Sequence, residues 1–445
     1  MAEYKMLRFI ESKLLLQWDI KRLFKKGYNS KYSMVLLQKC IKEENQKYNI
    51  HELNTDVGIL GVNNQTGIFD AYKEHSSKIK QKYKKMQTGW IAYNPYRVNV
   101  GSIGIKKDYH LYDYISPAYV VFSCFDNILP EYLFLLMKTN IFNTIIRDNT
   151  TGTVRQNLSF ETLINLQIPL PLIERQRELI NNYNNLINKA EQNELLAKQT
   201  ENEIQEYISN ELGISTTKKE KKKGLQFVEF KDIERWGINK ILSNVNYDKY
   251  NYSLSYIRNL CIMANRGKSP LYVENSTKIV LNQKCNRWNE IDLSNAKIVD
   301  STWLSSINRE LLTQERDIII NSTGEGTMGR CSVISKNYAN LFYDSHILLI
   351  RLDNNVVDST FFVELLNSNF GQGQIQEVKS AQATKQTELG LDNLFTIQIP
   401  LPPKEKQEEI VEHISKLREK IKGSKTEATR LRQQAINDFE QDIFA

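Results

Sequence analysis

Three short motifs resemble fragments of catalytic sites, and none of them is complete. A Glu-x-Lys triplet, typical of some nucleases, occurs at Glu11–Lys13 and again at Glu229–Lys231. Only Glu3 precedes the first triplet, where a further metal-holding carboxylate is needed. Asn94–Arg97 lacks the second proline of an amino-methyltransferase tetrapeptide, and Gly267–Ser269 lacks the first glycine of a phosphate-binding loop. The sequence therefore predicts a binding protein rather than an enzyme.

Metal and disulfide sites are not indicated either. The histidines show no HxH or HxxxH spacing, and the cysteines form no CxxC pair. These residues are His51, His75, His110, His346, His413, Cys40, Cys124, Cys261, Cys285 and Cys331. We therefore predict no metal or cofactor in this chain, and reduced, mostly buried thiols.

Residue types suited to DNA gather in the first half of the chain. Lysines and hydrogen-bonding side chains precede Gly101 and Gly104, where a backbone can approach a ligand closely. The candidates are Lys78, Lys80, Lys82, Lys84, Lys85, Tyr93, Asn94, Arg97 and Asn99. Alternatively, the glycines form a tight β-turn without a ligand, and the lysines form a solvated face.

The second half repeats this arrangement with different residues. Polar side chains precede Gly326 and Gly329, and Arg-Gln or Lys-Gln pairs occur near the end of each half. Arg and Lys can bind phosphate or guanine, and Gln can pair with adenine, although such residues are also common in solvated turns. The further DNA-binding candidates are Arg155, Gln156, Arg266, Lys268, Arg287, Asn321, Ser322, Thr323, Lys385 and Gln386.

An internal repeat must position these candidates. Ile168–Pro171 returns as Ile399–Pro402, with an offset of 231 (399 − 168). An earlier likeness places Trp18 against Trp236, with an offset of 218 (236 − 18). Two likenesses in the same order indicate a tandem duplication of about half the chain.

A heptad-like seam follows each copy of the proline-rich phrase. Apolar residues alternate at spacings of four and three, which predicts two long helices, the first from about Leu172 to Glu211. Such narrow seams favour packing of the two helices on each other as a coiled coil. The alternative is that each helix packs on its own domain. The predicted interface residues are Leu179, Tyr183, Leu186, Ile204, Ile410, Ile414, Leu417 and Ile421.

The predicted fold is α+β, a tandem pseudo-repeat of two mixed α/β domains, each followed by a long helix. Strands are expected at Ala118–Phe122, Ile318–Ile320 and Ile347–Ile350, and short helices at Glu131–Lys138 and Thr360–Asn367. The predicted boundaries are 1–167 for the first domain, 168–212 for its helix, 213–224 for an exposed lysine-rich linker, 225–398 for the second domain and 399–445 for the second helix. Alternatively, the lysine-rich linker is an arm that contacts phosphates.

Composition restricts the class of protein. No apolar run approaches the roughly 18 residues that a membrane span needs, so we expect a soluble intracellular protein. The net charge of +7 favours an anionic partner. The richness in Asn, Lys, Ile and Tyr can also reflect an AT-rich genome.

The repeated phrase carries a family resemblance. Ile-Pro-Leu-Pro followed by Glu-x-Gln, at Glu174–Gln176 and Glu405–Gln407, resembles the specificity subunits of type I restriction-modification systems. The likeness covers nearly the whole chain: a target-recognition domain, a helix, then a second copy of both. The first copy departs from the second by lacking the adjacent prolines Pro402 and Pro403, and the basic linker at 218–223 is not a feature of the family.

The resemblance implies a function in a larger assembly. Each target-recognition domain would read one half of a bipartite, asymmetric site on double-stranded DNA. The helices would form an antiparallel coiled coil that spaces the domains and docks methyltransferase subunits, expected to be two. Motor-nuclease subunits would join for restriction. S-adenosylmethionine would bind the methyltransferase, and ATP and Mg the motor-nuclease. This chain would be a non-catalytic subunit in the cytoplasm of a prokaryote, without a membrane partner.

Other functions remain open from the sequence. The same reader could serve a methylation-only complex or another phage-defence assembly. A coiled-coil adaptor that binds proteins would show no DNA affinity even when assembled. An enzyme acting alone is disfavoured by the incomplete motifs.

Overall fold

The computed structural model describes residues 29–98, 101–149, 157–218, 245–324, 326–381 and 387–444. The chain divides into two compact units, Met1–Glu194 with Lys425–Ala445 (unit 1) and Leu195–Ser424 (unit 2). These boundaries fall inside the long helices, so each unit contains one domain and parts of both helices. The Glu-x-Lys triplets, Trp18 and Trp236 lie outside the described residues.

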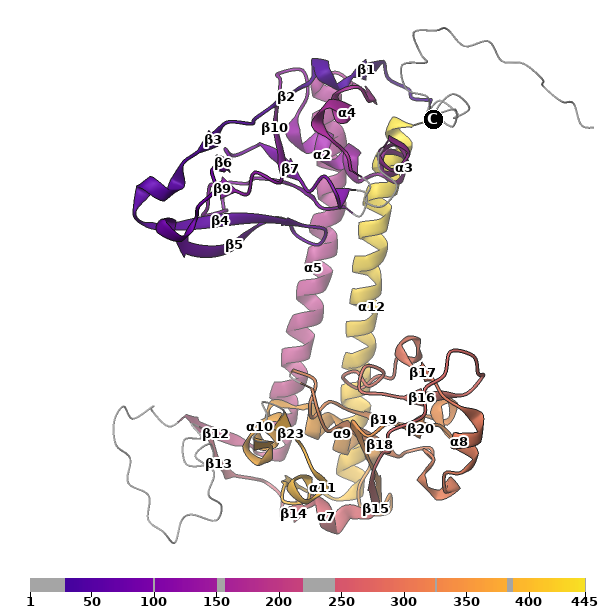
Figure 1. Ribbon diagram of the computed structural model, residues 1–445. Coiled ribbons are helices and arrows are strands. Elements are labelled where there is room, and N and C mark those ends of the chain that lie inside the picture. Colours follow the sequence, from indigo (N-terminus) through magenta and orange to yellow (C-terminus); the bar gives the residue numbers. More distant parts are fainter. Residues whose placement is uncertain are drawn as a thin grey trace, which may run out of the picture. The chain divides into compact units, whose positions relative to one another are not determined.

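Unit 1 contains a four-stranded sheet, a five-stranded sheet, a short strand pair and several short helices (Figure 1). The four-stranded sheet has the order β2 (Ile41–Glu43), β10 (Val120–Cys124), β7 (Ile91–Tyr93) and β8 (Ile103–Ile105). The five-stranded sheet has the order β3 (Lys47–Tyr48), β6 (Tyr83–Lys85), β9 (Tyr114–Ile115), β4 (Asp56–Asn63) and β5 (Gly67–His75). The short helices include α2 (Pro130–Lys138), α3 (Asn140–Asn149) and α4 (Phe160–Ile164).

The four-stranded sheet of unit 1 is buried on both faces. Side chains alternate between faces along a strand. Ile91 and Tyr93 of β7 therefore pack with Tyr132 of α2, whereas Ala92 packs with Leu60 of β4. The helices thus cover one face of this sheet, and the five-stranded sheet covers the other.

Unit 2 has a matching four-stranded sheet, in the order β15 (Cys261–Arg266), β21 (Ile347–Leu352), β18 (Ile318–Asn321) and β19 (Cys331–Val333). A three-stranded sheet has the order β17 (Lys297–Ile298), β16 (Ile279–Leu281) and β20 (Phe342–Tyr343). Two short hairpin-like pairs are β12 (Ser215–Lys218) with β13 (Val245–Lys249), and β22 (Ser380–Ala381) with β23 (Thr387–Glu388). Short helices include α7 (Ile257–Leu260), α8 (Ser301–Ser305), α9 (Ser359–Asn367), α10 (Asn369–Val378) and α11 (Leu391–Leu394).

The core of unit 2 repeats the two-sided burial of unit 1. Ile318 and Ile320 of β18 pack with the α9 residue Phe361, whereas Ile319 packs with Leu281 of β16. Runs of β-branched residues suit a strand that is buried on both faces. The predicted central strands and the two predicted short helices are confirmed within one or two residues at their ends.

The proline-rich phrases form short strands before the long helices. β1 (Met34–Leu36) pairs with β11 (Gln167–Pro169), and β14 (Leu254–Tyr256) pairs with β24 (Gln398–Pro400) in the same antiparallel register. Proline lacks the amide hydrogen that a helix interior needs, so each helix begins only after its phrase. The long helices are α5 (Ile173–Leu212) and α12 (Lys404–Ile443).

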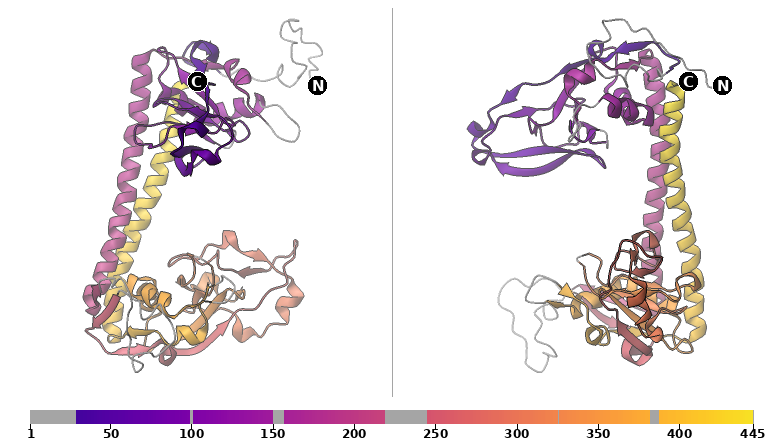
Figure 2. Two further views of the ribbon diagram at one scale, coloured as in Figure 1. Left: turned by 60° about the vertical axis from the view of Figure 1, so that its left-hand side comes forward. Right: turned by 45° about the vertical axis from the view of Figure 1, so that its right-hand side comes forward.

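The long helices lie side by side and antiparallel in both units (Figure 2). In unit 1, Ala190 packs with Ala428 and Leu431. In unit 2, Lys406 near the start of α12 forms an ion pair with Glu211 near the end of α5, at 2.7 Å. The predicted interface residues Ile204, Ile410, Ile414, Leu417 and Ile421 join one apolar cluster of unit 2, and Leu179, Tyr183 and Leu186 pack in unit 1. The coiled coil is therefore confirmed.

The predicted linker requires a correction. Residues Ser215–Lys218 form β12, which pairs with β13. The β-branched Thr216 and Thr217 favour a strand there, so the exposed linker cannot begin at 213. Residues 219–224 lie outside the described part. None of the described helices offers an apolar stretch that could cross a membrane.

Candidate nucleic-acid interface

One edge of the four-stranded sheet in unit 2 brings loops from distant parts of the sequence together. β15 ends there at Arg266, β18 ends at Asn321 and β21 begins at Ile347. Backbone hydrogen bonds join these loops, because the amide of Ser322 donates to the carbonyl of His346 at 2.9 Å and that of Leu389 donates to Ser322 at 2.8 Å. We call this the edge of unit 2.

Glycine allows close backbone contact at this edge. A methyl group at Gly267 would lie 2.1 Å from the carbonyl oxygen of Asp344, so no other residue fits there without a shift. Burial raises the pKa of the Asp344 carboxyl, which accepts a hydrogen bond from the amide of His346. The hydroxyl of Thr323 lies 2.8 Å from Nδ1 of His346. Thr323, a predicted contact, is half-buried at this edge.

Two predicted DNA contacts of this edge are interior residues. Asn321 and Ser322 are fully buried. Nδ2 of Asn321 donates to the carbonyls of Gln283 and Thr327, and its Oδ1 accepts from Asn286. These bonds hold the neighbouring loops, so Asn321 and Ser322 position the edge instead of reaching a groove.

Three predicted basic residues of unit 2 are exposed. Arg266 donates through Nε to the carbonyl of Ser345 at 2.8 Å and forms an ion pair with Glu388. Lys268 follows it in the adjacent loop. Arg287 lies 3.7 Å from Asp292. Cations of this kind can contact phosphates, which position a protein on DNA without reading its sequence.

The sequence did not single out a neighbouring pair, Trp288 and Arg330. The guanidinium carbon of Arg330 lies 5.5 Å from the ring centroid of Trp288, which is 44% exposed. Burial and the nearby Arg287 lower the pKa of Arg330, and its Nε is buried without a hydrogen-bond partner in the described part of the chain. A desolvated cation beside a second arginine favours an anionic ligand. A single sequence cannot reveal this contact, because its residues lie 42 positions apart (330 − 288).

The lysines of unit 1 fall into different environments. Lys84 is buried, and its Nζ donates to the carbonyl of Tyr119 at 2.9 Å. Burial lowers its pKa. Lys84 is therefore a structural residue and not a phosphate contact. The exposed lysines are Lys78, which pairs with Glu74 at 3.0 Å, Lys85, which lies 3.9 Å from Asp113, and Lys80 and Lys82.

The residues of unit 1 that were predicted to read a DNA groove also lie in different environments. Tyr93 is fully buried, and its hydroxyl donates to the carbonyl of Leu158 at 3.1 Å, so it cannot contact DNA. Asn94 is half-buried, and its Oδ1 accepts from the amide of Tyr96 and closes a turn. Arg97 in that turn is exposed. The predicted contacts Asn99, Arg155, Gln156, Lys385 and Gln386 lie outside the described residues.

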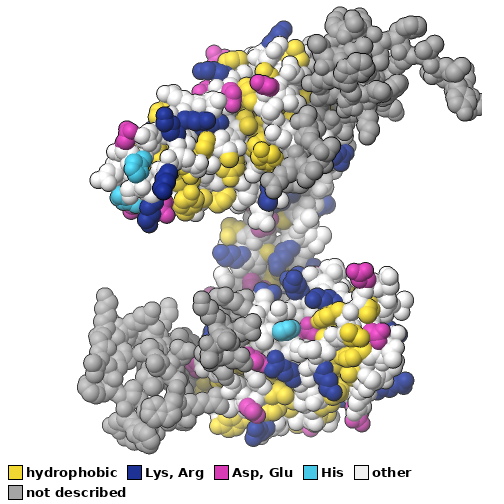
Figure 3. Space-filling model, viewed as in Figure 1, with side chains coloured by type: hydrophobic (Ala, Val, Ile, Leu, Met, Phe, Trp, Pro, Cys, Tyr) yellow, Lys and Arg dark blue, Asp and Glu magenta, His cyan; other side chains and the backbone are white. Residues whose placement is uncertain are grey.

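The two edges share a framework and differ in their side chains. Val120 and Ile347 begin equivalent strands, with an offset of 227 (347 − 120). The bond from Leu389 to Ser322 has its counterpart in unit 1, where the amide of Leu158 donates to Pro95 at 3.0 Å. Equivalent edge positions thus hold Pro95 and Ser322, and by the same offset Tyr119 and His346. Lys and Arg side chains are visible on the surface of each unit (Figure 3).

The described residues show no metal-binding chemistry. No group of three His, Cys, Asp or Glu among them could hold a metal ion. The five cysteines are free, and burial raises the pKa of the Cys124 and Cys261 thiols to about 12. The two edges therefore offer binding surfaces of loops, exposed cations and polar groups.

Comparison with known proteins gives the family. Residues 214–433 match the type I restriction modification DNA specificity domain. No curated protein matches the chain. A solved structure titled as the basis of complex assembly and conformational transition of a type I R-M system is 14% identical, with a TM-score of 0.55 over 94% of this chain and 100% of that one.

Two further solved structures resemble this chain. The HsdS subunit from Thermoanaerobacter tengcongensis is 15% identical, with a TM-score of 0.39 over 92% of this chain and 97% of that one. The type I restriction-modification S subunit from M. genitalium is 12% identical, with a TM-score of 0.42 over 94% and 98%. Residues 214–433 thus form a type I restriction-modification DNA specificity domain, a non-catalytic DNA-recognition domain, and the sheet order that returns before each long helix shows that unit 1 repeats its fold.

Proposed function

We propose that each unit reads one half of a bipartite, asymmetric site on double-stranded DNA. The edges of the two four-stranded sheets would approach the DNA. Exposed cations would supply affinity and salt dependence through phosphates, and a few loop side chains would select bases in the grooves.

The observation that carries the proposal is the shared framework with different edge residues. The order β2-β10-β7-β8 returns as β15-β21-β18-β19, so both units present their loops in the same way. The equivalent residues Tyr119 and His346 offer different hydrogen-bonding groups. Two domains with the same fold and different edge residues suit a DNA site whose two halves differ in sequence.

The long helices would act as a spacer and as a docking scaffold. At 1.5 Å per residue a helix of 40 residues is about 60 Å long. Two domains on one duplex bind the same side when they lie about a helical turn or a multiple of it apart. A coiled coil of fixed length would set that separation.

The partners follow from the family. Two methyltransferase subunits would dock on the coiled coil, bind S-adenosylmethionine and methylate adenine. Motor-nuclease subunits that use ATP and Mg would join for restriction. The complex would act in the prokaryotic cytoplasm.

Exchange of one domain tests this division of labour. Residues 225–398 would be replaced by the equivalent part of a relative with a known target, and adenine methylation would be mapped in cells that also express the cognate methyltransferase. One half of the methylated motif is expected to change while the other stays. A change in both halves would contradict independent reading.

A further inference from the structure

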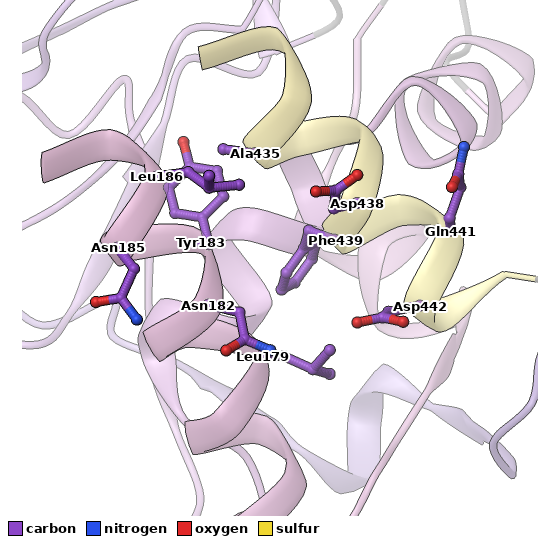
Figure 4. Close-up of a pocket in the computed structure, with 10 residues that line it drawn as sticks. All are labelled: Leu179, Asn182, Tyr183, Asn185, Leu186, Ala435, Asp438, Phe439, Gln441 and Asp442. Carbon is purple, nitrogen blue, oxygen red and sulfur yellow. The ribbon is translucent and has the colours of Figure 1, made fainter. Parts of the chain in front are cut away.

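A groove lies between α5 and α12 in unit 1. It has a volume of about 430 Å³ and is lined by Leu179, Asn182, Tyr183, Asn185, Leu186, Ala435, Asp438, Phe439, Gln441 and Asp442. Figure 4 shows the ring of Phe439 between the helices, with Asn182 on the α5 side and the carboxylates of Asp438 and Asp442 on the α12 side. The floor is therefore apolar, and the α12 rim is acidic.

The repeat supplies an internal comparison for this groove. The helices correspond with an offset of 231 (404 − 173), so Asn182 matches His413 and Asp438 matches Tyr207. In unit 2 the rings of Tyr207 and His413 stack across the two helices, with centroids 4.1 Å apart. Aromatic side chains of the chain itself thus occupy these positions in unit 2, whereas small polar ones leave them open in unit 1.

The ion pairs next to the groove are the same in the two units, so the units differ at the groove residues themselves. Arg175 lies 3.5 Å from Asp442 in unit 1, and its equivalent Lys406 lies 2.7 Å from Glu211 in unit 2. The same basic residues also pair with an acid three positions later in both helices. The different residues at the groove are therefore a local change, because the ion pairs around it are conserved between the two units.

The carboxylate of Asp438 makes the groove favour a positively charged ligand. Its Oδ2 accepts a hydrogen bond from Gln434 at 3.2 Å, and it forms no ion pair within the part of the chain that the structure describes. Asp442 is already paired with Arg175. A cation at Asp438 would cover the apolar floor with its methylene groups, as Lys and Arg side chains do, and place its charge at the carboxylate.

We propose that this groove docks a lysine or arginine of the methyltransferase subunit, so that the two ends of the coiled coil are unequal docking surfaces. This inference rests on the proposed function, because it takes the methyltransferase as the partner. The occupant is basic because the carboxylate of Asp438 lies beside the apolar floor and has no ion-pair partner in the described part of the chain. In unit 2, Tyr207 and His413 cover the equivalent place.

Filling the groove with the side chains of unit 2 tests the proposal. The variant combines Asn182→His with Asp438→Tyr, a pair that α5 and α12 already tolerate at the equivalent positions. Binding of the fluorescently labelled cognate methyltransferase to the full chain would be measured over a range of salt concentrations. The affinity at this end is expected to fall about tenfold or more, the scale of a buried interface anchor.

Two further variants separate charge from shape. Asp438→Asn keeps the groove open and is expected to weaken binding and reduce its salt dependence, and it remains informative if the filled variant does not fold. Asn188→His with Asn437→Tyr places the same new side chains on exposed positions of the same helices, outside the lining residues, and should bind within twofold of the unaltered chain.

The outcomes distinguish this inference from the proposed function. Unchanged binding in the folded filled variant would overturn the groove as a docking site, and unchanged salt dependence in Asp438→Asn would overturn the basic occupant. If filling abolished self-association of this chain and left methyltransferase binding intact, the occupant would be a second copy and the proposal would be wrong. An unaltered chain that bound no methyltransferase would remove the proposed function as well.

Discussion

Gln176 and Gln407, which lie 231 residues apart (407 − 176), hold matching sets of hydrogen bonds in the two units. Both side chains are fully buried. Each Oε1 accepts at 2.8 Å from the backbone amide that precedes a helix, Leu129 before α2 and Asp358 before α9. Each Nε2 donates at 2.9 Å to the proline carbonyl five residues earlier. The glutamine of the repeated phrase thus ties each domain to its long helix.

Replacing Gln407 by leucine should destabilise unit 2. The change leaves the amide of Asp358 and two carbonyls, those of Val356 and Pro402, without this partner. A buried polar group without a partner costs about 1–3 kcal/mol, so we expect a loss of roughly 2–4 kcal/mol. Urea unfolding of the full chain measures it. The exposed Gln192→Leu on α5 is the control, and an equal midpoint for both variants would contradict the role of Gln407.

The ion pair between Arg418 and Glu364 should depend on both partners. Nη2 of Arg418 lies 2.6 Å from Glu364, which is 5% exposed, and Arg418 also pairs with Glu201. Arg418→Ile alone leaves a buried carboxylate unpaired, which costs up to about 3–5 kcal/mol and less here because Arg418 is a quarter exposed.

The repeat suggests the compensating change for this pair. The equivalent positions of unit 1 hold Ile187 and Leu135, with offsets of 231 for the long helices and 229 (359 − 130) for α2 and α9. Adding Glu364→Leu to Arg418→Ile should recover most of the lost stability, because an apolar pair replaces a buried ion pair at little cost. A double-mutant cycle by thermal unfolding would show additive losses if the two residues act independently.

Arg330→Ala should weaken DNA binding through unit 2 alone. If its guanidinium meets a phosphate, the slope of log affinity against log salt should fall by about 1, and the preferred sequence should stay the same. If it contacts a guanine, selectivity at one position should relax. Arg258→Ala is the matched control, since α7 precedes β15 and Arg258 lies at the opposite end of that strand from the edge. Equal salt slopes in filter-binding assays of both variants would remove Arg330 from the interface.

Asp344→Asn should raise the melting temperature at neutral pH. Burial raises the pKa of this carboxyl in the folded state, so its charged form destabilises the fold at pH values above the raised pKa. This penalty shrinks as the pH falls from the pKa of the folded state toward the lower pKa of the unfolded state, because the carboxyl becomes protonated in the folded protein. Below both pKa values the carboxyl is neutral in both states. The carboxamide oxygen of the variant can still accept the hydrogen bond from the backbone N–H of His346. Melting curves from pH 7 to pH 4 should show a gain that shrinks with acidity, and a constant gain would contradict this cause.

The sequence predicts the long helices and central strands because each carries a regular signal. The seam of α5 returns in α12 with a constant offset, and Ile318–Ile320 is a continuous run of β-branched residues. The hairpin of β4 and β5 was not predicted, although Gly67 with a φ of 73° marks its turn. That signal is weak in a single sequence, because many glycines lie in loops.

The candidate DNA contacts were harder to predict, for two physical reasons. Strands buried on both faces hide polar residues as well as apolar ones, and Lys84 and Asn321 are therefore satisfied inside the chain. Contacts such as Arg330 over Trp288 depend on loops that approach only in the folded state. Residue type and proximity in sequence cannot distinguish a loop residue that faces a ligand from one that holds the loop.

The measurement that tests the central claim most directly is single-molecule sequencing of adenine methylation in cells. Cells that express this chain with its cognate methyltransferase would be compared with cells that express the methyltransferase alone. The account predicts a split motif with two defined halves that is methylated only when this chain is present. Absence of new methylation, despite a stable complex of the two proteins, would contradict DNA reading by this chain and favour a protein-binding adaptor.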